Sequence, residues 1–387
     1  MSKSIKLGQV VLYSKERVDV GKVSLESFVT VDNLLPNKGG IAIAENMPPQ
    51  GVTLPKYQKE NILVGNIRPY LKKIWFANRD GGAAADVLIF DVKPNHCPKF
   101  VYYAMVRDDF FGHMMRGKKG TKMPRGDKNQ ILDFPIPDIE YTTQECIASV
   151  LSSLDAKIEL NNRINAELET MAKTLYDYWF VQFEFPDKKG KPYKSSGGKM
   201  VWNAEIKRDI PEGWEVIKIG TVLAKETATK KILSSEILNN GKIPVIDQST
   251  DFIAGYTNDE DSVINANEPR IVFGDHTRIL KFIHFDFARG ADGTQVLLSN
   301  TQRMPQHLFY HTLLKIDLSN YGYARHFKFL KETNILLPDE TSAQLYKETV
   351  KSYFDMIKQI LFQNQELIHL RDFLLPLLMN GQVKVKR

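Results

Sequence analysis

The chain has 387 residues, of which 43% are hydrophobic and 25% are charged, and its formal net charge is +6. This length predicts two or three domains with cores of their own, and the composition is that of a globular protein rather than a disordered or fibrous one. Neither a membrane-spanning apolar run nor the apolar core of a signal peptide is present, which predicts a cytoplasmic protein without a membrane partner.

Cysteine and histidine usage excludes several kinds of site. The only cysteines are Cys97 and Cys146, and they form no CxxC motif and no Cys/His cluster. This pattern excludes a disulfide scaffold and a structural zinc site, and it favours a reducing compartment. The mild excess of basic charge is compatible with nucleic-acid binding but does not establish it.

The first 140 residues predict a mixed α/β domain. Pro and Gly clusters separate short apolar runs that are typical of strands. A basic, glycine-rich loop at 116–126 follows a predicted helix. The predicted strands and the predicted helix lie at 61–65, 73–77, 86–90 and 100–111.

A long amphipathic stretch at 141–182 predicts a helix with a coiled-coil seam. Thr142 and Thr143 are expected to cap its start. Its apolar positions alternate in steps of four and three, which is the a/d pattern of a coiled coil. The seam positions are Ile147, Leu151, Leu154, Ile158, Asn161, Asn165, Leu168, Ala172, Leu175 and Trp179.

The same seam returns about 200 residues later, so the chain contains a two-copy repeat. Asn165 corresponds to Asn364, and a polar residue in a seam fixes register at a cost in stability. Arg371 also enters the second seam, where we expect its side chain to extend to solvent. The second seam comprises Tyr346, Val350, Tyr353, Ile357, Ile360, Asn364, Leu367, Arg371, Leu374 and Leu378.

The globular segments repeat more weakly than the helices. Ile271 to Gly274, followed by Arg278, echoes Leu63 to Gly65, followed by Arg68. Residues 186–199 are rich in Pro, Gly, Ser and Lys without periodicity, which predicts an exposed linker, placed at 183–210. The predicted boundaries are recognition domain 1 at 1–140, helix 1 at 141–182, the linker at 183–210, domain 2 at 211–339, helix 2 at 340–380 and a basic tail at 381–387.

These patterns predict an α+β fold with a pseudo-two-fold repeat. Two mixed α/β domains are separated by two long helices that form an antiparallel intramolecular coiled coil. A helix over 147–179 is roughly 50 Å long at 1.5 Å per residue, so we expect it to act as a spacer between the domains.

Near-matches to catalytic motifs are incomplete, and we expect no catalytic residue, metal or cofactor. The stretch from Gly112 to Lys119 approaches a phosphate-binding loop, but Lys119 occupies the place of the required Ser or Thr. Asp187, Glu205 and Lys207 resemble a metal-dependent nuclease set, but the aspartate falls in the predicted linker. No GxSxG or HExxH motif is present.

Basic residues near turns are the remaining functional signal. Lys and Arg among Gly, Thr and Tyr are suited to phosphate contact and to bidentate readout of guanine. The alternative for any single residue is a solvated surface charge. The candidate DNA-binding residues are Arg68, Lys72, Lys73, Arg116, Lys118, Lys119, Thr121, Lys122, Arg125, Arg270, Arg278, Lys281, Arg289, Arg303 and Arg325.

Four stretches make the chain resemble the DNA specificity subunit of type I restriction–modification enzymes. They are the helix from Ile147 to Asn165 with its extension to Phe180, the run from Lys191 to Gly198, the motif Pro211-Glu-Gly-Trp214, and the run from Leu374 to Val383. The chain departs from the family pattern in three places. The first domain lacks a Pro-x-Gly-Trp motif, the start of the second helix at 339–345 is unusual, and Arg371 enters the seam.

The resemblance implies two target recognition domains, each contacting one half of an asymmetric bipartite sequence in double-stranded DNA. It implies that the helices place the half-sites about one helical turn apart. It also implies two methyltransferase (modification) subunits that bind S-adenosylmethionine, and motor-nuclease (restriction) subunits that use ATP. The chain itself would be non-catalytic. The alternatives are a self-contained endonuclease or methyltransferase, and a coiled-coil adaptor that does not bind DNA.

Overall fold

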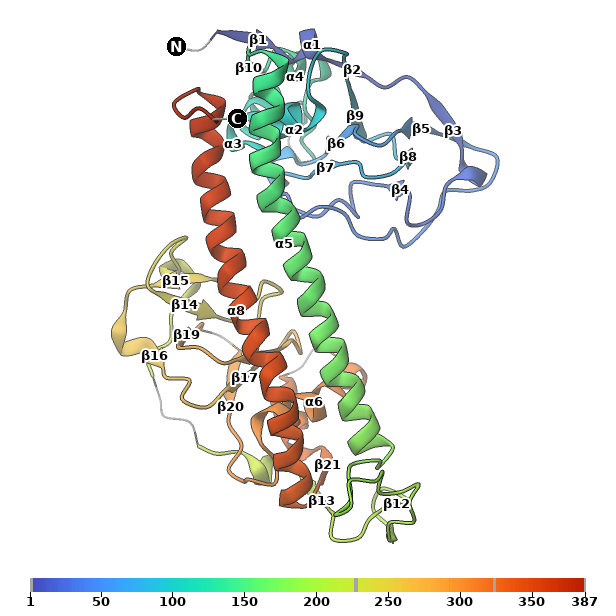
Figure 1. Ribbon diagram of the computed structural model, residues 1–387, viewed down its shortest axis with the longest axis vertical. Helices are drawn as coiled ribbons and strands as arrows, with labels where there is room; N and C mark the ends of the chain where they lie inside the picture. Colours follow the sequence, from blue (N-terminus) through green and yellow to red (C-terminus); the bar gives the residue numbers. More distant parts are fainter. Residues whose placement is uncertain (1–2, 121, 226–228, 292, 323–324, 386–387) are drawn as a thin grey trace. The chain divides into compact units, whose positions relative to one another are not determined.

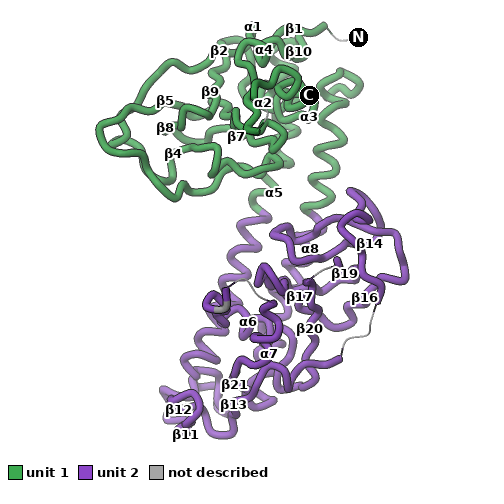
Figure 2. The backbone as a smooth tube through the Cα atoms, turned by 180° about the vertical axis from the view of Figure 1, so that it is seen from behind, with its two compact units in different colours: residues 1–160, 364–387 green, residues 161–363 purple. Residues whose placement is uncertain are grey.

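Residues 3–120, 122–225, 229–291, 293–322 and 325–385 are described by the computed structural model of the chain. Two units are present, one made of residues 1–160 and 364–387 and the other of residues 161–363 (Figure 2). Both long helices pass from one unit into the other, so each unit contains a part of each helix. Among the described residues, no helix is long and apolar enough to cross a membrane.

The centre of the first unit is a four-stranded antiparallel sheet with the order β2-β9-β6-β7. Successive side chains of a strand point to opposite faces. Ile62 and Val64 of β6 therefore enter the core beneath the helices, while Leu63 enters a second core with Trp75. Both faces are covered, which explains why this strand is apolar at each position. The strands span Val11–Tyr13, Val87–Val92, Ile62–Gly65 and Ile74–Phe76.

A second sheet of the first unit has the order β3-β5-β8-β4, in which β4 runs parallel to β8. Its strands span Arg17–Asp19, Thr53–Tyr57, Gly81–Ala83 and Phe28–Val29. A short pair closes the unit, formed by β1 (Ser4–Lys6) and β10 (Pro135–Pro137). The short helices are α1 (Leu7–Val10), η1 (Val20–Lys22), η2 (Pro69–Leu71), α2 (Pro98–Val106), α3 (Asp108–Arg116) and α4 (Lys128–Leu132).

The predicted helix at 100–111 is in fact two helices. Arg107 adopts an extended conformation between α2 and α3, with φ −63° and ψ 147°. Asp108 and Asp109 then lie in the first turn of α3, where negative charge is favourable. The single-helix prediction missed this break because the apolar positions continue across it.

The second unit repeats this plan. Its central sheet has the order β18-β17-β20, with strands Leu280–Ile283, Arg270–Gly274 and Thr294–Leu297. Its second sheet has the order β15-β14-β19-β16, with strands Gly255–Thr257, Ile243–Ile246, Phe287–Arg289 and Val263–Ile264. The closing pair joins β13 (Glu215–Lys218) to β21 (Asn334–Leu337). The helical segments are η4 (Ile219–Val222), η5 (Ser234–Glu236), η6 (Glu260–Ser262), α6 (Gln306–Leu314), η7 (Ser319–Tyr321) and α7 (His326–Glu332).

Corresponding elements occur in the same chain order in both units. The opening strands β1 and β13 pair with the last strands before the long helices, β10 and β21. The three central strands β9, β6 and β7 correspond to β20, β17 and β18, and in both units the middle one pairs antiparallel with its two neighbours. The predicted α+β fold with repeated mixed domains is therefore confirmed.

The two long helices are α5 (Tyr141–Tyr176) and α8 (Glu340–Met379), drawn green and red in Figure 1. In the second unit, Asn161 Nδ2 donates to Gln363 Oε1 at 2.8 Å, and the Tyr346 hydroxyl donates to the carbonyl of Ala172 at 3.1 Å. Numbers rise along one helix while they fall along the other, so the helices are antiparallel there. Every predicted seam residue of both helices is buried or half-buried.

Arg371 does not extend to solvent as the sequence suggested. Its Nη1 lies 2.9 Å from Asp155 Oδ1, in the part of the two helices that belongs to the first unit. The other oxygen of Asp155 accepts a hydrogen bond from the Tyr103 hydroxyl at 2.5 Å. An acidic partner on α5 therefore keeps the guanidinium within the helix pair.

Segment 183–210 is folded, which corrects the expected exposed linker. A π-helical turn, η3 (Asp177–Val181), ends the first long helix, and a hairpin of β11 (Met200–Asn203) and β12 (Arg208–Pro211) follows. Phe183 and Phe185 are buried, and Phe185 stacks between Tyr193 and Trp214. Composition suggested a linker, but the aromatic side chains of Phe183, Phe185 and Tyr193 pack into the core of the second unit.

Thr142 and Thr143 do not cap α5, because the helix already begins at Tyr141. The amides of Thr143 and Gln144 instead donate to the carbonyl of Glu140. Gln144 is the polar residue that fixes this end, since its Oε1 accepts from the amide of Cys97 at 2.9 Å and its Nε2 donates to the carbonyl of Ile139 at 2.8 Å.

Candidate nucleic-acid interface

A short basic hairpin follows α3 in the first unit. The amides of Lys119 and Arg125 each donate to the other residue's carbonyl, at 2.8 and 2.9 Å. Gly120 has φ +84°, a conformation that glycine adopts without steric cost, and it allows the chain to reverse between them. The predicted basic loop is therefore an ordered structure that holds its side chains on a hydrogen-bonded frame.

The turn between β6 and β7 lies against this hairpin. The amide of Arg68 donates to the carbonyl of Pro124 at 2.8 Å, and Ile67 forms a β-bridge with Arg125. Exposed Tyr70 and Met123 add apolar surface at the same place. The structure thus brings together exposed basic residues that are distant in sequence, namely Arg68, Arg116, Lys118, Lys119, Lys122, Arg125 and the unpredicted Lys128.

Exposed ion pairs hold several of these cations in place. Arg125 Nη2 lies 3.1 Å from Asp86, and Lys119 Nζ lies 2.5 Å from Asp127. The hydrogen bond from Lys119 lowers the pKa of Asp127, which also caps α4. Exposed pairs of this kind contribute little to stability, roughly 0–1 kcal/mol each. A phosphate can therefore replace the carboxylate partners at little energetic cost.

Lys72 and Lys73 are adjacent in sequence but differ in their surroundings. Lys72 Nζ pairs with Asp108 at 2.9 Å, a carboxylate that Lys38 also contacts at 2.8 Å. Lys73 donates to the carbonyl of Val31 at 2.5 Å, and burial lowers its pKa. Lys73 therefore supports the turn rather than offering a free charge. Thr121, another predicted contact, lies outside the described residues.

The candidate DNA-binding residues of the second unit also divide into accessible residues and residues with a structural role. Arg278 and Arg325 are exposed, at the β17–β18 turn and before α7. Arg270 and Arg289 are half-buried, and Arg270 donates to the carbonyl of Glu268 at 2.6 Å. These four residues remain candidates for DNA contact.

Lys281 and Arg303 are structural residues. The side chain of Lys281 is 3% exposed, and its Nζ donates to the carbonyl of Asp251 at 2.5 Å. Arg303 donates to the carbonyl of Pro338 and pairs with Glu215 at 2.6 Å, so it ties β13 to the end of β21. We leave both out of the candidate interface, because their donors are already used inside the unit.

The near-matches to catalytic motifs are also explained by structure. Gly112 lies within helix α3, so no phosphate-binding loop forms there. Asp187 accepts from the amides of Lys189 and Lys191 in a tight turn, and Glu205 accepts from Asn334. Within the described ranges, no group of three His, Cys, Asp or Glu side chains has the geometry to hold a metal ion.

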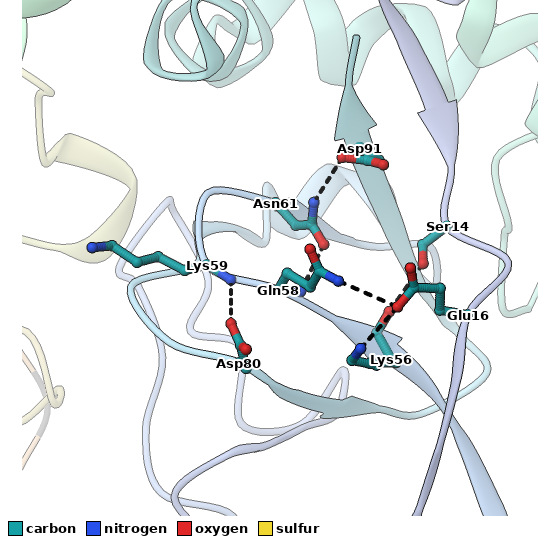
Figure 3. A network of polar contacts seen from close by, with 8 residues as sticks. All are labelled: Ser14, Glu16, Lys56, Gln58, Lys59, Asn61, Asp80 and Asp91. Carbon is teal, nitrogen blue, oxygen red and sulfur yellow. Dashed lines mark hydrogen bonds and ion pairs between the residues drawn. The ribbon is translucent and has the colours of Figure 1, made fainter. Parts of the chain in front are cut away.

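A polar network joins the two sheets of the first unit (Figure 3). Glu16 accepts from Lys56 at 2.9 Å and from Gln58 at 3.3 Å, and Asn61 donates to Asp91 at 3.3 Å. The hydrogen bond from Lys56 lowers the pKa of Glu16. Each of these carboxylates already has a partner, so the network has a structural role.

The chain thus has an α+β repeat with exposed basic turns in both units, which is suited to a DNA-binding protein with two recognition domains. The family model described as "Type I restriction modification DNA specificity domain" matches residues 21–170 and again residues 211–368. The chain belongs to this family, whose role is DNA sequence recognition in type I restriction–modification systems. Each match covers one mixed α/β domain and continues into a long helix, which confirms the internal repeat.

Two type I restriction enzyme specificity subunits are similar to this chain in sequence, and a third protein is similar in structure. The MjaIX type I restriction enzyme specificity subunit of Methanocaldococcus jannaschii is 26% identical over 311 residues, covering 74% of this chain and 69% of that protein. The HindI specificity subunit of Haemophilus influenzae is 22% identical over 475 residues, covering 98% and 99%. The crystal structure of an S subunit from M. genitalium matches with a TM-score of 0.59 at 15% identity, covering 98% and 96%, which shows the shared fold.

Proposed function

We propose that this chain is the non-catalytic recognition subunit of a type I restriction–modification complex, and that its two units read the two halves of an asymmetric, bipartite DNA sequence. The double family match carries this proposal, because it assigns the same kind of recognition domain to each unit. Exposed arginines on corresponding turns support it. Arginine on such a turn is suited to both phosphate contact and guanine readout.

Differences between the two units support an asymmetric target. In the first unit, the segment after the sheet-covering helices carries Lys118, Lys122 and Arg125 on an ordered hairpin. The sequence between α6 and α7 of the second unit contains only Lys315 and Arg325 as basic residues. Units with different charges on corresponding loops contact different base pairs or different numbers of phosphates.

Exposed apolar residues on the long helices support the docking of methyltransferase and motor-nuclease subunits. Phe373 is 60% exposed and Leu370 is 43% exposed. They lie three residues apart on α8, so they share one face of the helix. Met171 on α5 and Met356 on α8 are also about half exposed. Large exposed apolar side chains that share a face are typical of protein interaction sites.

Binding selection with the purified full chain tests the recognition role. The chain is incubated with randomised duplex DNA, and the bound fraction is sequenced over several rounds. We expect one asymmetric motif with two specified blocks, and no methyl transfer from S-adenosylmethionine until a type I methyltransferase subunit is added. Enrichment of no motif, alone and with that subunit, would support the adaptor alternative. Methylation or cleavage by the chain alone would revive the enzyme alternative.

Co-purification tests the assembly role separately. We expect L370E/F373E to reduce recovery of the methyltransferase subunit while leaving DNA selection unchanged. The matched control is E366Q, which changes an exposed residue of the same helix without adding charge to an apolar face. Equal recovery with both variants would remove this face of α8 from the proposed docking surface.

A further inference from the structure

In both units, the turn after the central strand begins in the same way. Gly65 ends β6 and Gly274 ends β17, and each is followed by an Asx residue. The amides of Asn66 and Asp275 donate to the carbonyls of Asp86 and Gly293, at 2.9 and 2.7 Å. The start of the turn is therefore shared by the two units, although the turn spans 66–73 in the first and only 275–279 in the second.

The side chains of these Asx residues fix the segment that precedes the next short helix. Asn66 Oδ1 accepts from the amide of Gly126 at 3.1 Å, and Asp275 Oδ1 accepts from the amide of Phe327 at 2.8 Å. Gly126 lies just before α4, and Phe327 lies in the first turn of α7, the corresponding helix. The turn is therefore anchored on its inner side in the same manner in both units.

A lysine near the end of each turn bonds to a backbone carbonyl of another segment: Lys73 lies just before β7, and Lys281 lies within β18. Lys73 Nζ donates to the carbonyl of Val31, and Lys281 Nζ donates to the carbonyl of Asp251, both at 2.5 Å. Lys73 is half-buried, and Lys281 is almost fully buried. In both units, the arginine lies in the turn between the Asx residue and this lysine.

Each turn contains an arginine in the left-handed backbone conformation. Arg68 has φ +52° and Arg278 has φ +62°. This conformation is unfavourable for a residue with a Cβ atom, whereas glycine adopts it freely. Strain of this kind persists where the surrounding structure imposes it, and it is concentrated at functional sites.

Both guanidinium groups are available for a ligand. Arg68 and Arg278 are exposed, and neither guanidinium donates a hydrogen bond to a residue in the described part of the chain. The pKa of Asp317 is lowered by hydrogen bonds from Ser319 and, to a smaller extent, by the charge of Arg278, so a carboxylate lies near this guanidinium. Arg303, by contrast, uses its donors on carbonyls and Glu215 of its own unit.

We propose that Arg68 and Arg278 are specificity residues, each presented by its strained turn to a guanine edge in one half of the DNA target. A guanidinium matches the O6 and N7 acceptors of guanine in the major groove with two parallel hydrogen bonds. A rigid turn places this fork in one orientation, which base discrimination requires. The inference rests on the proposed function, since it assigns residues to half-sites that the function postulates.

Three substitutions at each arginine test this inference in the full chain. R68A and R278A remove the guanidinium, R68K and R278K keep the charge without the bidentate fork, and R68G and R278G remove the backbone strain. Matched controls are E60G in the first unit and K207G in the second, because both residues have positive φ, at +73° and +53°, and lie in other turns, between β5 and β6 and between β11 and β12. The measurements are motif selection from randomised duplexes, affinity for the selected duplex, and the thermal midpoint.

Each alanine variant is expected to lose about 5- to 100-fold in affinity for the selected duplex and to lose base preference in one half-site only. The lysine variants should lose the same base preference with a smaller loss of affinity. The glycine variants should lose binding while their thermal midpoints stay equal or rise by about 2 °C. E60G and K207G should bind like the parent chain.

Other outcomes overturn the inference in distinguishable ways. Parent-like motifs in the alanine and lysine variants would refute the specificity role while leaving the proposed function intact. If the variants bind all duplexes more weakly by the same factor and select an unchanged motif, both arginines contact phosphates and do not read bases. A lower thermal midpoint in R68G and R278G that accounts for the lost binding would make the turn purely structural. Selection of no motif by the parent chain would overturn the proposed function and this inference together.

Discussion

At the scale of single residues, the helix pair of the first unit contains a polar cluster that its repeat lacks. Arg371 pairs with Asp155, and Asp155 accepts from Tyr103. In the repeat frame, Arg371 corresponds to Ala172 and Asp155 corresponds to Phe354, and both of these are buried. One position of the seam is therefore ionic in one unit and apolar in the other. This difference favours the pairing of α5 with α8 over the pairing of either helix with its own copy.

Removing one member of this pair should destabilise the first unit. We expect R371L to lower the free energy of unfolding by about 1–2 kcal/mol, because Asp155 is left half-buried without its cation. The double variant R371L/D155L should recover much of that loss, since an apolar pair can replace an ion pair. Urea unfolding of the parent chain, R371L, D155L and R371L/D155L gives the coupling energy between the two residues. Additive losses from the two single substitutions would show that the residues do not interact.

At the scale of elements, the strands and the long helices were predictable because burial leaves a periodic record. The runs at 61–65 and 86–90 are apolar on both faces, and the structure places them as β6 and β9. The seam of the long helices repeats at the coiled-coil period, so their existence followed from spacing alone. Local breaks left no such record, as the extended Arg107 between α2 and α3 shows. In segment 183–210, the Pro, Gly, Ser and Lys content concealed aromatic residues that pack into the core of the second unit.

The candidate interface was predictable in part, for a related reason. Sequence identified Arg68 and Arg278 through the echo of the preceding apolar strand. It could not separate them from Lys73 and Lys281, because the orientation of a side chain in a turn depends on backbone conformation rather than residue type. The exposed Lys128 was missed because it follows the basic loop as the first residue of α4.

The second unit contains three histidines whose pKa values are lowered by burial. Burial lowers the pKa of His307 to about 3 and the pKa values of His284 and His311 to about 4, all from an ordinary value of 6.5. His307 and His311 lie on α6, and His311 lies 3.0 Å from the Tyr346 hydroxyl. The folded unit thus holds neutral imidazoles where the unfolded chain would bind protons.

Acid should therefore destabilise the second unit within a defined pH range. Because the folded pKa values lie below the unfolded value, the stability contribution is complete above pH 6.5 and is lost progressively as pH falls towards 4. Each histidine contributes a slope of up to about 1.4 kcal/mol per pH unit in that range. Hydrogen exchange at several pH values should show α6 losing protection before α2. H307F removes one titrating group and should reduce the pH dependence, whereas an unchanged profile would exclude His307 as a cause.

At the scale of the whole molecule, the two units share a framework and differ in what is added to it. Strands β5, β8 and β4 correspond to β16, β19 and β14, with the same parallel and antiparallel pairing. The fourth strand joins opposite edges of this trio, since β3 pairs with β5 while β15 pairs with β14. Divergence is therefore concentrated at the sheet edges and turns, while the central sheets and long helices are retained. This distribution is expected of two domains that keep one assembly role and recognise different sequences.

If lysines of the basic hairpin contact phosphates, the salt dependence of DNA affinity should depend on where the basic residues lie and not only on the net charge of the chain. The affinity for DNA should fall linearly with salt on logarithmic axes, with a slope of about −0.9 for each phosphate contact. K118Q/K122Q removes two exposed charges from the basic hairpin and its approach, so we expect the slope to become shallower by about one to two. K188Q/K189Q removes two equally exposed charges from the tip of segment 183–210 and should leave the slope unchanged. Titrations at several salt concentrations measure both, and equal changes in the two variants would mean that net charge, not the hairpin, governs binding.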